Sequence, residues 1–296
     1  MLSICIPTYN HNITSLVTEV IAQCNALNIL YEIQVLNDGS SIAESTILEK
    51  SLIDSSKVNY NFSENNMGRT ATRNFLARHS TFNWLLFLDA DVRIDNKSFI
   101  SSYVESISEK NNIIFGGVAY EERPPKNEFM LRWKYGSSRE VKTAKERLIS
   151  PHFIISQNLL ILKNTFLTLN DLDENRYGLD NYFSSRIKKL KIPILHIDNP
   201  VIHLGLENNS KFLSKGIKAV QTLVYLENEN KISSDLTPLQ RAYSSLKKYH
   251  TISIFKAFVD RNMKRIEKNL TGSNPSLKLY DIYRLYHYIL AKNKNA

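Results

Sequence analysis

Two carboxylates one residue apart, Asp89 and Asp91, directly follow the apolar run 84–88. A buried strand that ends in this way places both side chains at the rim of a sheet, where they can converge on a hard cation such as Mg²⁺ or Mn²⁺. A solvated turn is the other interpretation of the pair. The position directly after a strongly apolar strand favours the metal site.

Two basic residues stand shortly before that strand. Gly68 predicts a tight turn into a helix, and the N-terminal amides of a helix favour an anion. Arg69 and Arg73 are four residues apart, so they share one helix face and can both reach phosphates. A surface helix with two solvated arginines fits this stretch equally well when the stretch is taken alone.

The elements that must position these residues alternate along the chain. Strands are expected at 2–6, 31–36, 58–62 and 84–88, and helices at 13–27, 42–52 and 69–79. This alternation predicts βαβ units and a largely parallel sheet, which binds ligands at the carboxyl ends of its strands. Beyond them we expect a helix at 97–110, strands at 113–119, 158–162 and 192–204, an irregular segment at 120–150, and helices from about 210 onward.

Four segments, taken in order, resemble a known family. They are Ser3-Ile4-Cys5-Ile6-Pro7-Thr8-Tyr9-Asn10, Leu36-Asn37-Asp38-Gly39-Ser40, the stretch 66–74 and Asp89-Ala90-Asp91. Together they are similar to the inverting, nucleotide-sugar-dependent glycosyltransferases of family 2, whose pattern is P-x-Y-N, D-D-G-S, N-x-G-x-x-x-x-R-N and D-x-D. Residues 177–186 resemble the family's G-E-D-x-D-L-x-x-R segment, and 201–205 the strand that carries its metal-binding histidine.

The resemblance implies an α/β protein with the GT-A fold, which has a Rossmann-like, mostly parallel central sheet flanked by helices. It covers residues 1–230, which we therefore expect to form the glycosyltransferase domain. Residues 231–296 would be a basic, helical C-terminal extension.

The resemblance, together with the turn and the arginines above, gives each site residue an expected role. Asp180 would be the general base. The donor nucleotide would be held by Pro7, Thr8, Tyr9, Asp38, Gly68, Arg69, Arg73 and Asp89. Asp91 and His203, with Asp89 as a further candidate, would ligate Mn²⁺ or Mg²⁺. Asn158 and Trp133 are expected on the sugar or acceptor side, although ordinary packing fits Trp133 equally well.

These roles predict transfer of a sugar from a nucleotide-diphosphate donor, with a UDP-sugar favoured, to a hydroxyl of a glycan or lipid-linked acceptor. The departing diphosphate gains negative charge that a divalent cation neutralises, and the attacking hydroxyl loses its proton to a carboxylate. Asn37 and Leu179 depart from the family pattern, which usually has acids at both places. A catalytically inactive nucleotide-binding or scaffold protein is therefore an alternative, and a nucleotidyltransferase a weaker one.

The net charge of +9 belongs to the C-terminal region. Residues 231–296 carry 13 basic and 4 acidic residues, whereas residues 1–230 carry 25 of each. No nucleic-acid partner is expected, because the sequence contains no recognised binding module. The helix expected at 252–270 combines basic residues with an apolar face made by Ile252, Phe255, Val259, Met263 and Ile266. Its apolar face either packs on the domain or contacts an anionic membrane leaflet.

The sequence contains no apolar stretch of ~18 residues and no signal-peptide pattern, so a cytoplasmic protein is expected. The membrane interpretation of the helix at 252–270 would place it peripherally on the inner face of the membrane. The histidines other than His203 show no metal-ligand spacing and are expected to be core or surface polar residues.

Overall fold

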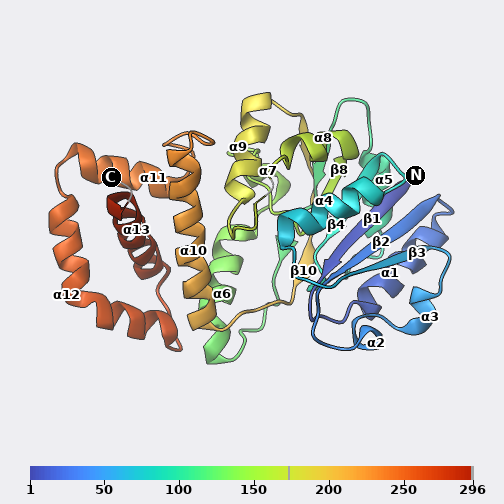
Figure 1. Ribbon diagram of the computed structural model, residues 1–296, viewed down its shortest axis with the longest axis horizontal. Helices are drawn as coiled ribbons and strands as arrows, with labels where there is room; N and C mark the ends of the chain where they lie inside the picture. The colour runs from blue at the N-terminus through green and yellow to red at the C-terminus, as the bar shows by residue number, and fades with distance from the viewer. Residues whose placement is uncertain (173, 295–296) are drawn as a thin grey trace. The chain divides into compact units, whose positions relative to one another are not determined.

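The computed structural model describes residues 1–172 and 174–294 (Figure 1). The chain divides into two compact units. Unit 1 comprises residues 1–121, 141–175 and 186–205, and unit 2 comprises residues 122–140, 176–185 and 206–296. The predicted domain boundary at residue 230 lies inside unit 2. The division into domains at 1–230 and 231–296 stays a prediction. Residues 295 and 296 lie outside the residues that the structure describes.

Unit 1 is built on a larger sheet with the strand order β3-β2-β1-β4-β8-β6-β9. Its strands are β1 (Leu2–Thr8), β2 (Tyr31–Asp38), β3 (Val58–Ser63), β4 (Trp84–Leu88), β6 (Ile113–Phe115), β8 (Asn158–Leu162) and β9 (Ile194–His196). All neighbouring pairs are parallel except those that β8 makes with β4 and β6. The predicted α/β class with a mostly parallel central sheet is confirmed.

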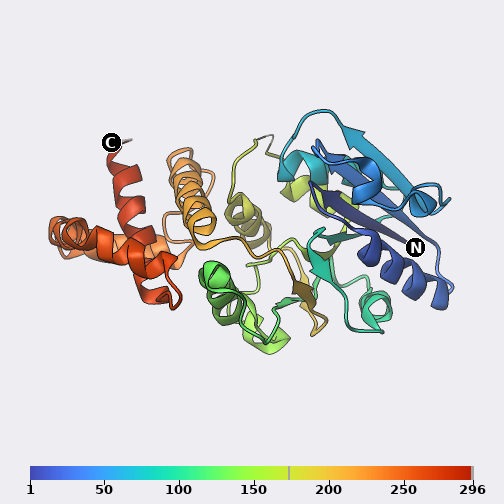
Figure 2. The same cartoon turned by 90° about the horizontal axis from the view of Figure 1, so that it is seen from below.

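Alternating side chains divide the larger sheet into two apolar faces. Ile4, Ile6 and Leu86 pack in one core with the helices α1 (Thr14–Ala26) and α5 (Phe99–Ser106). On the other face Phe87 packs against Phe166, with ring centroids 4.5 Å apart. That face carries α4 (Arg69–His79) and α8 (Lys163–Leu169), and Figure 2 shows the two pairs of helices on opposite sides of the strands.

The remaining helices of unit 1 are short. The helix expected at 42–52 is two separate turns, α2 (Glu44–Ile47) and α3 (Lys50–Ile53). Within the segment expected to be irregular, unit 1 also contains α7 (Ala144–Arg147), which begins with a capping box between Thr143 and Glu146.

A smaller sheet in unit 1 has the order β5-β10-β7, with β5 (Val92–Arg93), β7 (Val118–Ala119) and β10 (Val201–His203). The single strand predicted at 113–119 is therefore wrong, because β6 and β7 belong to different sheets. The chain turns between them at Gly117, whose φ of +88° is a conformation that side chains with a Cβ rarely adopt.

Unit 2 is helical. It contains η1 (Asn127–Phe129), α6 (Met130–Tyr135), the π-helical turn η2 (Gly136–Glu140), α10 (Asn209–Asn228), α11 (Pro238–Lys248), α12 (Ile252–Thr271) and α13 (Leu277–Lys294). The helix α9 (Asp180–Leu190) begins in unit 2 and ends in unit 1. The expectation that residues 120–150 are irregular is wrong, because η1, α6, η2 and α7 occupy much of that segment.

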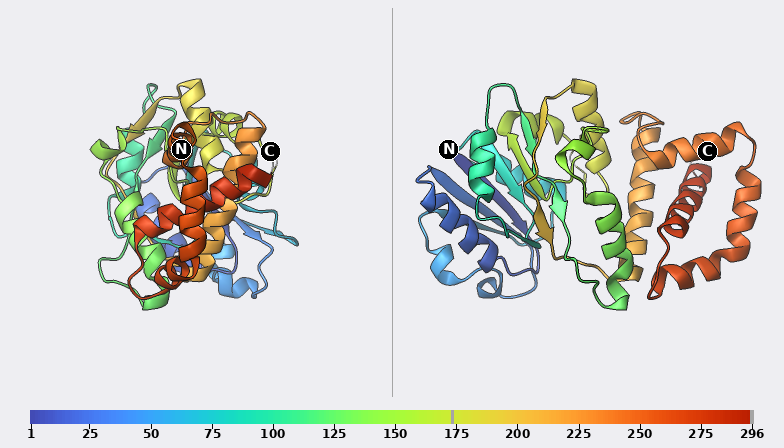
Figure 3. Two further views of the ribbon diagram at one scale, coloured as in Figure 1. Left: turned by 90° about the vertical axis from the view of Figure 1, so that its left-hand side faces the viewer. Right: turned by 180° about the vertical axis from the view of Figure 1, so that it is seen from behind.

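The apolar face predicted for the helix at 252–270 is covered. Val259, Ile266 and Leu270 are buried in a core with Phe212 of α10 and Tyr280 of α13. In Figure 1 and in the right view of Figure 3, α13 lies between α10 and α12. This face therefore packs within the unit, and the interpretation that it contacts a membrane is wrong. Within the described residues, no helix is long and apolar enough to cross a membrane.

Candidate active site

The loops that follow β1 and β2 are tied to each other at the carboxyl edge of the larger sheet. The backbone N–H of Asn10 donates to Ser40 Oγ at 2.7 Å, and the N–H of Ser41 donates to Asn10 Oδ1 at 2.8 Å. Thr8 is buried, and its hydroxyl donates to the carbonyl oxygen of His11. Because parallel strands end at the same edge of a sheet, Thr8, which pairs with Asn37, ends β1 beside the end of β2.

Asp38 fixes the turn that leads into α4. Its two carboxylate oxygens accept hydrogen bonds from the backbone N–H groups of Met67 (2.7 Å) and Gly68 (3.1 Å). Asp38 is buried and is the last residue of β2. The carboxylate therefore positions the N-terminal turn of α4, and a contact between Asp38 and a nucleotide stays a prediction.

Asp89 lies between two arginines of α4. Arg73 Nη2 donates to Asp89 Oδ1, and Arg69 Nη2 donates to Asp89 Oδ2 at 3.0 Å. The side chains of Arg73 and Asp89 are almost fully buried, whereas that of Arg69 is 60% exposed. Both oxygens of Asp89 are thus engaged by guanidinium groups, so its position does not favour the predicted role as an additional metal ligand.

Asp91 faces His203. Its Oδ2 atom lies 3.4 Å from His203 Nε2, and its side chain is 32% exposed. The smaller sheet causes this approach, because β5 follows Asp91 directly and pairs with β10 so that Val92 is opposite His203. Gly205 is also required, since a Cβ atom at that position would lie 1.8 Å from Asp91 Oδ2.

The electrostatic surroundings of Asp91 keep it ionised. Burial alone would raise its pKa, but the hydrogen bond and charge of His203, with the charges of Arg69 and His11, outweigh burial and lower the pKa to about 2. His203 is buried, its ring lies 5.3 Å from that of Tyr120, and its Nδ1 atom makes no hydrogen bond within the described residues.

The Asp91–His203 pair offers one oxygen and one nitrogen ligand, a set that suits Mn²⁺ or Mg²⁺ when substrate oxygens complete the coordination. Among residues 1–172 and 174–294, no group of three or more His, Cys, Asp or Glu side chains is placed to hold a metal ion. The residues present therefore fit a divalent ion that shares its ligands with a bound diphosphate, and they do not form a complete metal site by themselves.

Asp180 belongs to unit 2, where it is the exposed first residue of α9. The loop before it is anchored on α10: the Arg176 guanidinium stacks on the Tyr225 ring at 3.9 Å, and Lys215 Nζ lies 5.2 Å from the centre of the Tyr177 ring. Gly178 packs against Ala219 of the same helix. These contacts hold the start of α9 in place within unit 2 while its carboxylate faces solvent.

The two residues expected on the sugar side have different environments. Asn158 is fully buried: it accepts from the Tyr103 hydroxyl at 2.7 Å and donates to the carbonyl oxygens of Gly117 and Asn199. Its amide thus joins the start of β8 to α5 and to the loops at Gly117 and Asn199, and this position argues against the predicted sugar contact. Trp133 lies half-buried in α6 of unit 2.

Other predicted residues lie at the edge of the sheet, and some residues of the site were not predicted. Tyr9 is exposed and Pro7 is partly buried, next to the well-buried Thr8. His11, which was expected to be an ordinary polar residue, and Gly205 both belong to the surroundings of Asp91. Only their positions in the sequence could have indicated that they lie near the site. His11 follows the end of β1 by three residues, and Gly205 follows His203 by two.

The model of the family Glycosyl transferase family 2 matches residues 3–167, which is more than half of the chain. No curated protein matches the sequence. One similar solved structure is a mannosyltransferase from Pyrobaculum calidifontis in complex with GDP-Man and Mn²⁺ (TM-score 0.53, 12% identity, 99% of this chain and 86% of that chain covered). Another is a mannosyl-3-phosphoglycerate synthase from Rubrobacter xylanophilus (TM-score 0.54, 11% identity, 80% and 77% covered).

These findings bear on the predicted functions. At such low identity the two solved structures show the fold alone, and with the observed sheet they confirm the predicted GT-A architecture with its C-terminal helical region. The family match favours a glycosyltransferase over a scaffold protein or a nucleotidyltransferase. The chain belongs to glycosyltransferase family 2.

Proposed function

We propose that this glycosyltransferase moves a sugar, with inversion, from a nucleotide-diphosphate donor to a hydroxyl of a glycan or lipid-linked acceptor, and that the donor is a UDP-sugar. The observation that carries the proposal is the juxtaposition of the ionised Asp91 with His203, both in unit 1. The cluster of Arg69, Asp89 and Arg73 in the same unit adds fixed positive charge. Such a combination suits a diphosphate better than a neutral ligand.

Asp91 and His203 would hold Mn²⁺ or Mg²⁺, which when bound neutralises the charge that develops on the departing diphosphate. Arg73 keeps Asp89 in place, and the more exposed Arg69 is the arginine that can contact a phosphate. The predicted contacts of Pro7, Thr8, Tyr9, Asp38 and Gly68 with the nucleotide are part of this proposal, as is an acceptor-side role of Trp133.

Asp180 is the proposed general base, which accepts the proton of the attacking acceptor hydroxyl. A carboxylate suits this role, and the Asp180 side chain is exposed and makes no hydrogen bond or ion pair with other residues in the described part of the chain. Direct attack of the hydroxyl on the anomeric carbon gives an inverted product without an enzyme-bound sugar. A cytoplasmic location, peripheral on the inner face of the membrane, is also part of the proposal. Its membrane contact rests on the charge of the C-terminal helices and not on the apolar face of α12, which is buried in unit 2.

A panel of nucleotide sugars tests donor binding. Thermal unfolding is measured with each UDP- and GDP-sugar, with and without Mn²⁺. A bound donor at 100 times its Kd stabilises the native state by about 2.7 kcal/mol. The proposal expects a metal-dependent rise of Tm with a UDP-sugar and none with free sugars. GDP-mannose is included because the similar mannosyltransferase was solved with it, and a response to GDP-mannose instead would correct the proposed nucleotide.

The substitution Asp180→Asn tests the base. It should lower kcat for transfer by about 10²- to 10⁴-fold and leave the donor-induced Tm shift unchanged, because only proton acceptance is lost. Asp54→Asn, at another exposed aspartate, is the matched control and should leave both values unchanged. NMR of the product anomer should show inversion, and retained configuration would contradict direct attack.

A further inference from the structure

We propose that the outer face of α12 binds an anionic lipid bilayer. The face is formed by Ile254, Phe258, Arg261, Arg265 and Lys268, together called the α12 stripe. This function is independent of glycosyl transfer, and it uses a different face from the apolar one that packs inside unit 2.

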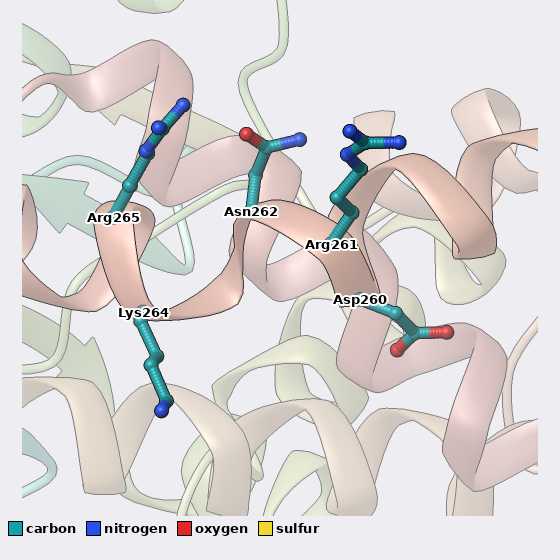
Figure 4. A pocket seen from close by; sticks show the side chains of 5 residues that line it. All are labelled: Asp260, Arg261, Asn262, Lys264 and Arg265. Atoms are coloured by element: carbon teal, nitrogen blue, oxygen red, sulfur yellow. The ribbon is translucent and has the colours of Figure 1, made fainter.

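The spacing of the stripe places its members on a single side of the helix. Successive residues are separated by four, three, four and three positions, which is the repeat of one helical face. The buried residues Val259 and Ile266 lie on the opposite side. In Figure 4, Arg261 and Arg265 point to the same side of α12, whereas Asp260 and Lys264 point away from them. All four side chains, with Asn262, line one pocket.

The stripe combines exposed apolar side chains with unpaired cations. Ile254 is 71% exposed and Phe258 is 56% exposed. Arg261, Arg265 and Lys268 are exposed as well, and none makes an ion pair with another residue that the structure describes. Asp260 is instead engaged by the Tyr286 hydroxyl of α13. The stripe therefore carries a local charge of +3, within the region that holds the chain's whole excess of +9.

An anionic bilayer fits this combination. Ile254 and Phe258 can enter the boundary between headgroups and acyl chains while the three cations remain among anionic headgroups. Nucleic acid would use the cations but would gain nothing from the exposed aliphatic side chain of Ile254. A symmetric contact with a second copy of the chain would bring two sets of three cations together, and that like-charge contact is unfavourable.

Sedimentation of the full-length protein with vesicles tests the charges. The vesicles are an equal mixture of phosphatidylglycerol and phosphatidylcholine. The triple substitution R261Q/R265Q/K268Q should weaken partitioning by about 100-fold, since each basic residue near an anionic surface contributes about fivefold. The matched control K110Q/K188Q/K189Q removes three exposed lysines from unit 1 and should leave partitioning nearly unchanged. Equal losses in both variants would overturn the proposal, because net charge alone would then explain binding.

A second variant, I254S/F258S, tests the apolar part. It should weaken partitioning by about tenfold, because two side chains no longer enter the bilayer. Unchanged partitioning of this variant would overturn the proposal. A molecular mass in sedimentation velocity that differs from that of the native chain would also overturn it, because a second copy of the chain would then be what covers the α12 stripe. Displacement from vesicles by inorganic phosphate, but not by sodium chloride at the same ionic strength, would indicate a site for free phosphate instead and would overturn the proposal. All variants should keep the Tm of the native chain, so loss of folding cannot imitate the result.

Discussion

Arg69 and Arg73 in α4 have the same spacing of four residues as Arg261 and Arg265 in α12, but the two pairs lie in opposite environments. The first pair converges on Asp89 at the edge of the larger sheet in unit 1. The second pair faces solvent in unit 2 without a carboxylate partner in the described part of the chain. Identical residues at identical spacing are therefore used once to build a rigid site and once to present charge. What decides between these uses is whether the fold brings a carboxylate to the helix.

Among the changes that compare the two arginine pairs and their surroundings, removal of the ionised carboxylate beside His203 should have the largest effect. Asp91→Asn should lower kcat by about 1,000-fold, because the site loses the group that would hold the metal ion. The same change should leave vesicle binding intact, since that function belongs to the other arginine pair. Steady-state kinetics over a range of Mn²⁺ concentrations checks this result. Wild-type turnover in the variant would remove Asp91 from the proposed site.

Removal of one arginine from each pair compares the two environments directly. Arg73→Gln should lower the free energy of unfolding by about 3–5 kcal/mol, because it takes away the buried partner of the buried Asp89. Arg265→Gln, at an exposed and unpaired position, should change it by no more than about 0.5 kcal/mol. Urea unfolding of both variants measures the difference. Similar losses in the free energy of unfolding for Arg73→Gln and Arg265→Gln would mean that the different environments of the two pairs do not affect stability.

Glu227 sharpens the comparison, because it is a well-paired carboxylate inside unit 2. Burial would raise its pKa, but hydrogen bonds from Lys292, Tyr288 and Gln240 outweigh burial and hold the pKa below its ordinary value of 4.5. A lowered carboxylate pKa gives stability that is present above the ordinary pKa and is lost as the pH falls. Glu227→Gln should cost about 2 kcal/mol at neutral pH and almost nothing at strongly acidic pH. A cost that does not depend on pH would argue against the paired carboxylate.

Arg69→Gln should have the smallest effect on stability. Its guanidinium is largely exposed, and exposed ion pairs contribute about 0–1 kcal/mol. The variant should instead raise the donor KM, since Arg69 is the arginine of the first pair that can reach a phosphate. Thermal unfolding and donor titration, made on the same preparation, separate the two effects. A large loss of stability would place Arg69 with Arg73 as a structural residue.

The sequence predicted the elements of the site well. The helix expected at 69–79 is α4, the strand expected at 84–88 is β4, and the apolar runs that end in polar residues do end at one edge of the sheet. These features are local, because periodicity, glycine turns and strand ends are written in short stretches of sequence.

Local patterns alone did not predict features that depend on the approach of distant segments. Nothing in D-x-D indicates that the first aspartate binds two arginines. The approach of Asp91 to His203, more than a hundred residues away, was expected only because the resemblance to the family implies that both ligate the metal ion. The sequence around Asn158 does not indicate that its side-chain amide forms hydrogen bonds with Tyr103, Gly117 and Asn199. The apolar face of α12 was recognised, but its cover is supplied by residues of α10 and α13 that the helix's own sequence does not reveal.

The place of β8 has a consequence for how the protein folds as it is synthesised. Strands β1 to β4 can form a parallel sheet from the first 88 residues, but both neighbours of β6 in the sheet, β8 and β9, come later in the chain. The apolar residues 113–115 and the free edge of β4 must therefore wait until residues 158–162 leave the ribosome. Such delayed pairing slows folding and exposes a strand edge that other chains can bind. Translation pauses that occur before residues 158–162 have left the ribosome should therefore favour aggregation more than pauses that occur after these residues have left it.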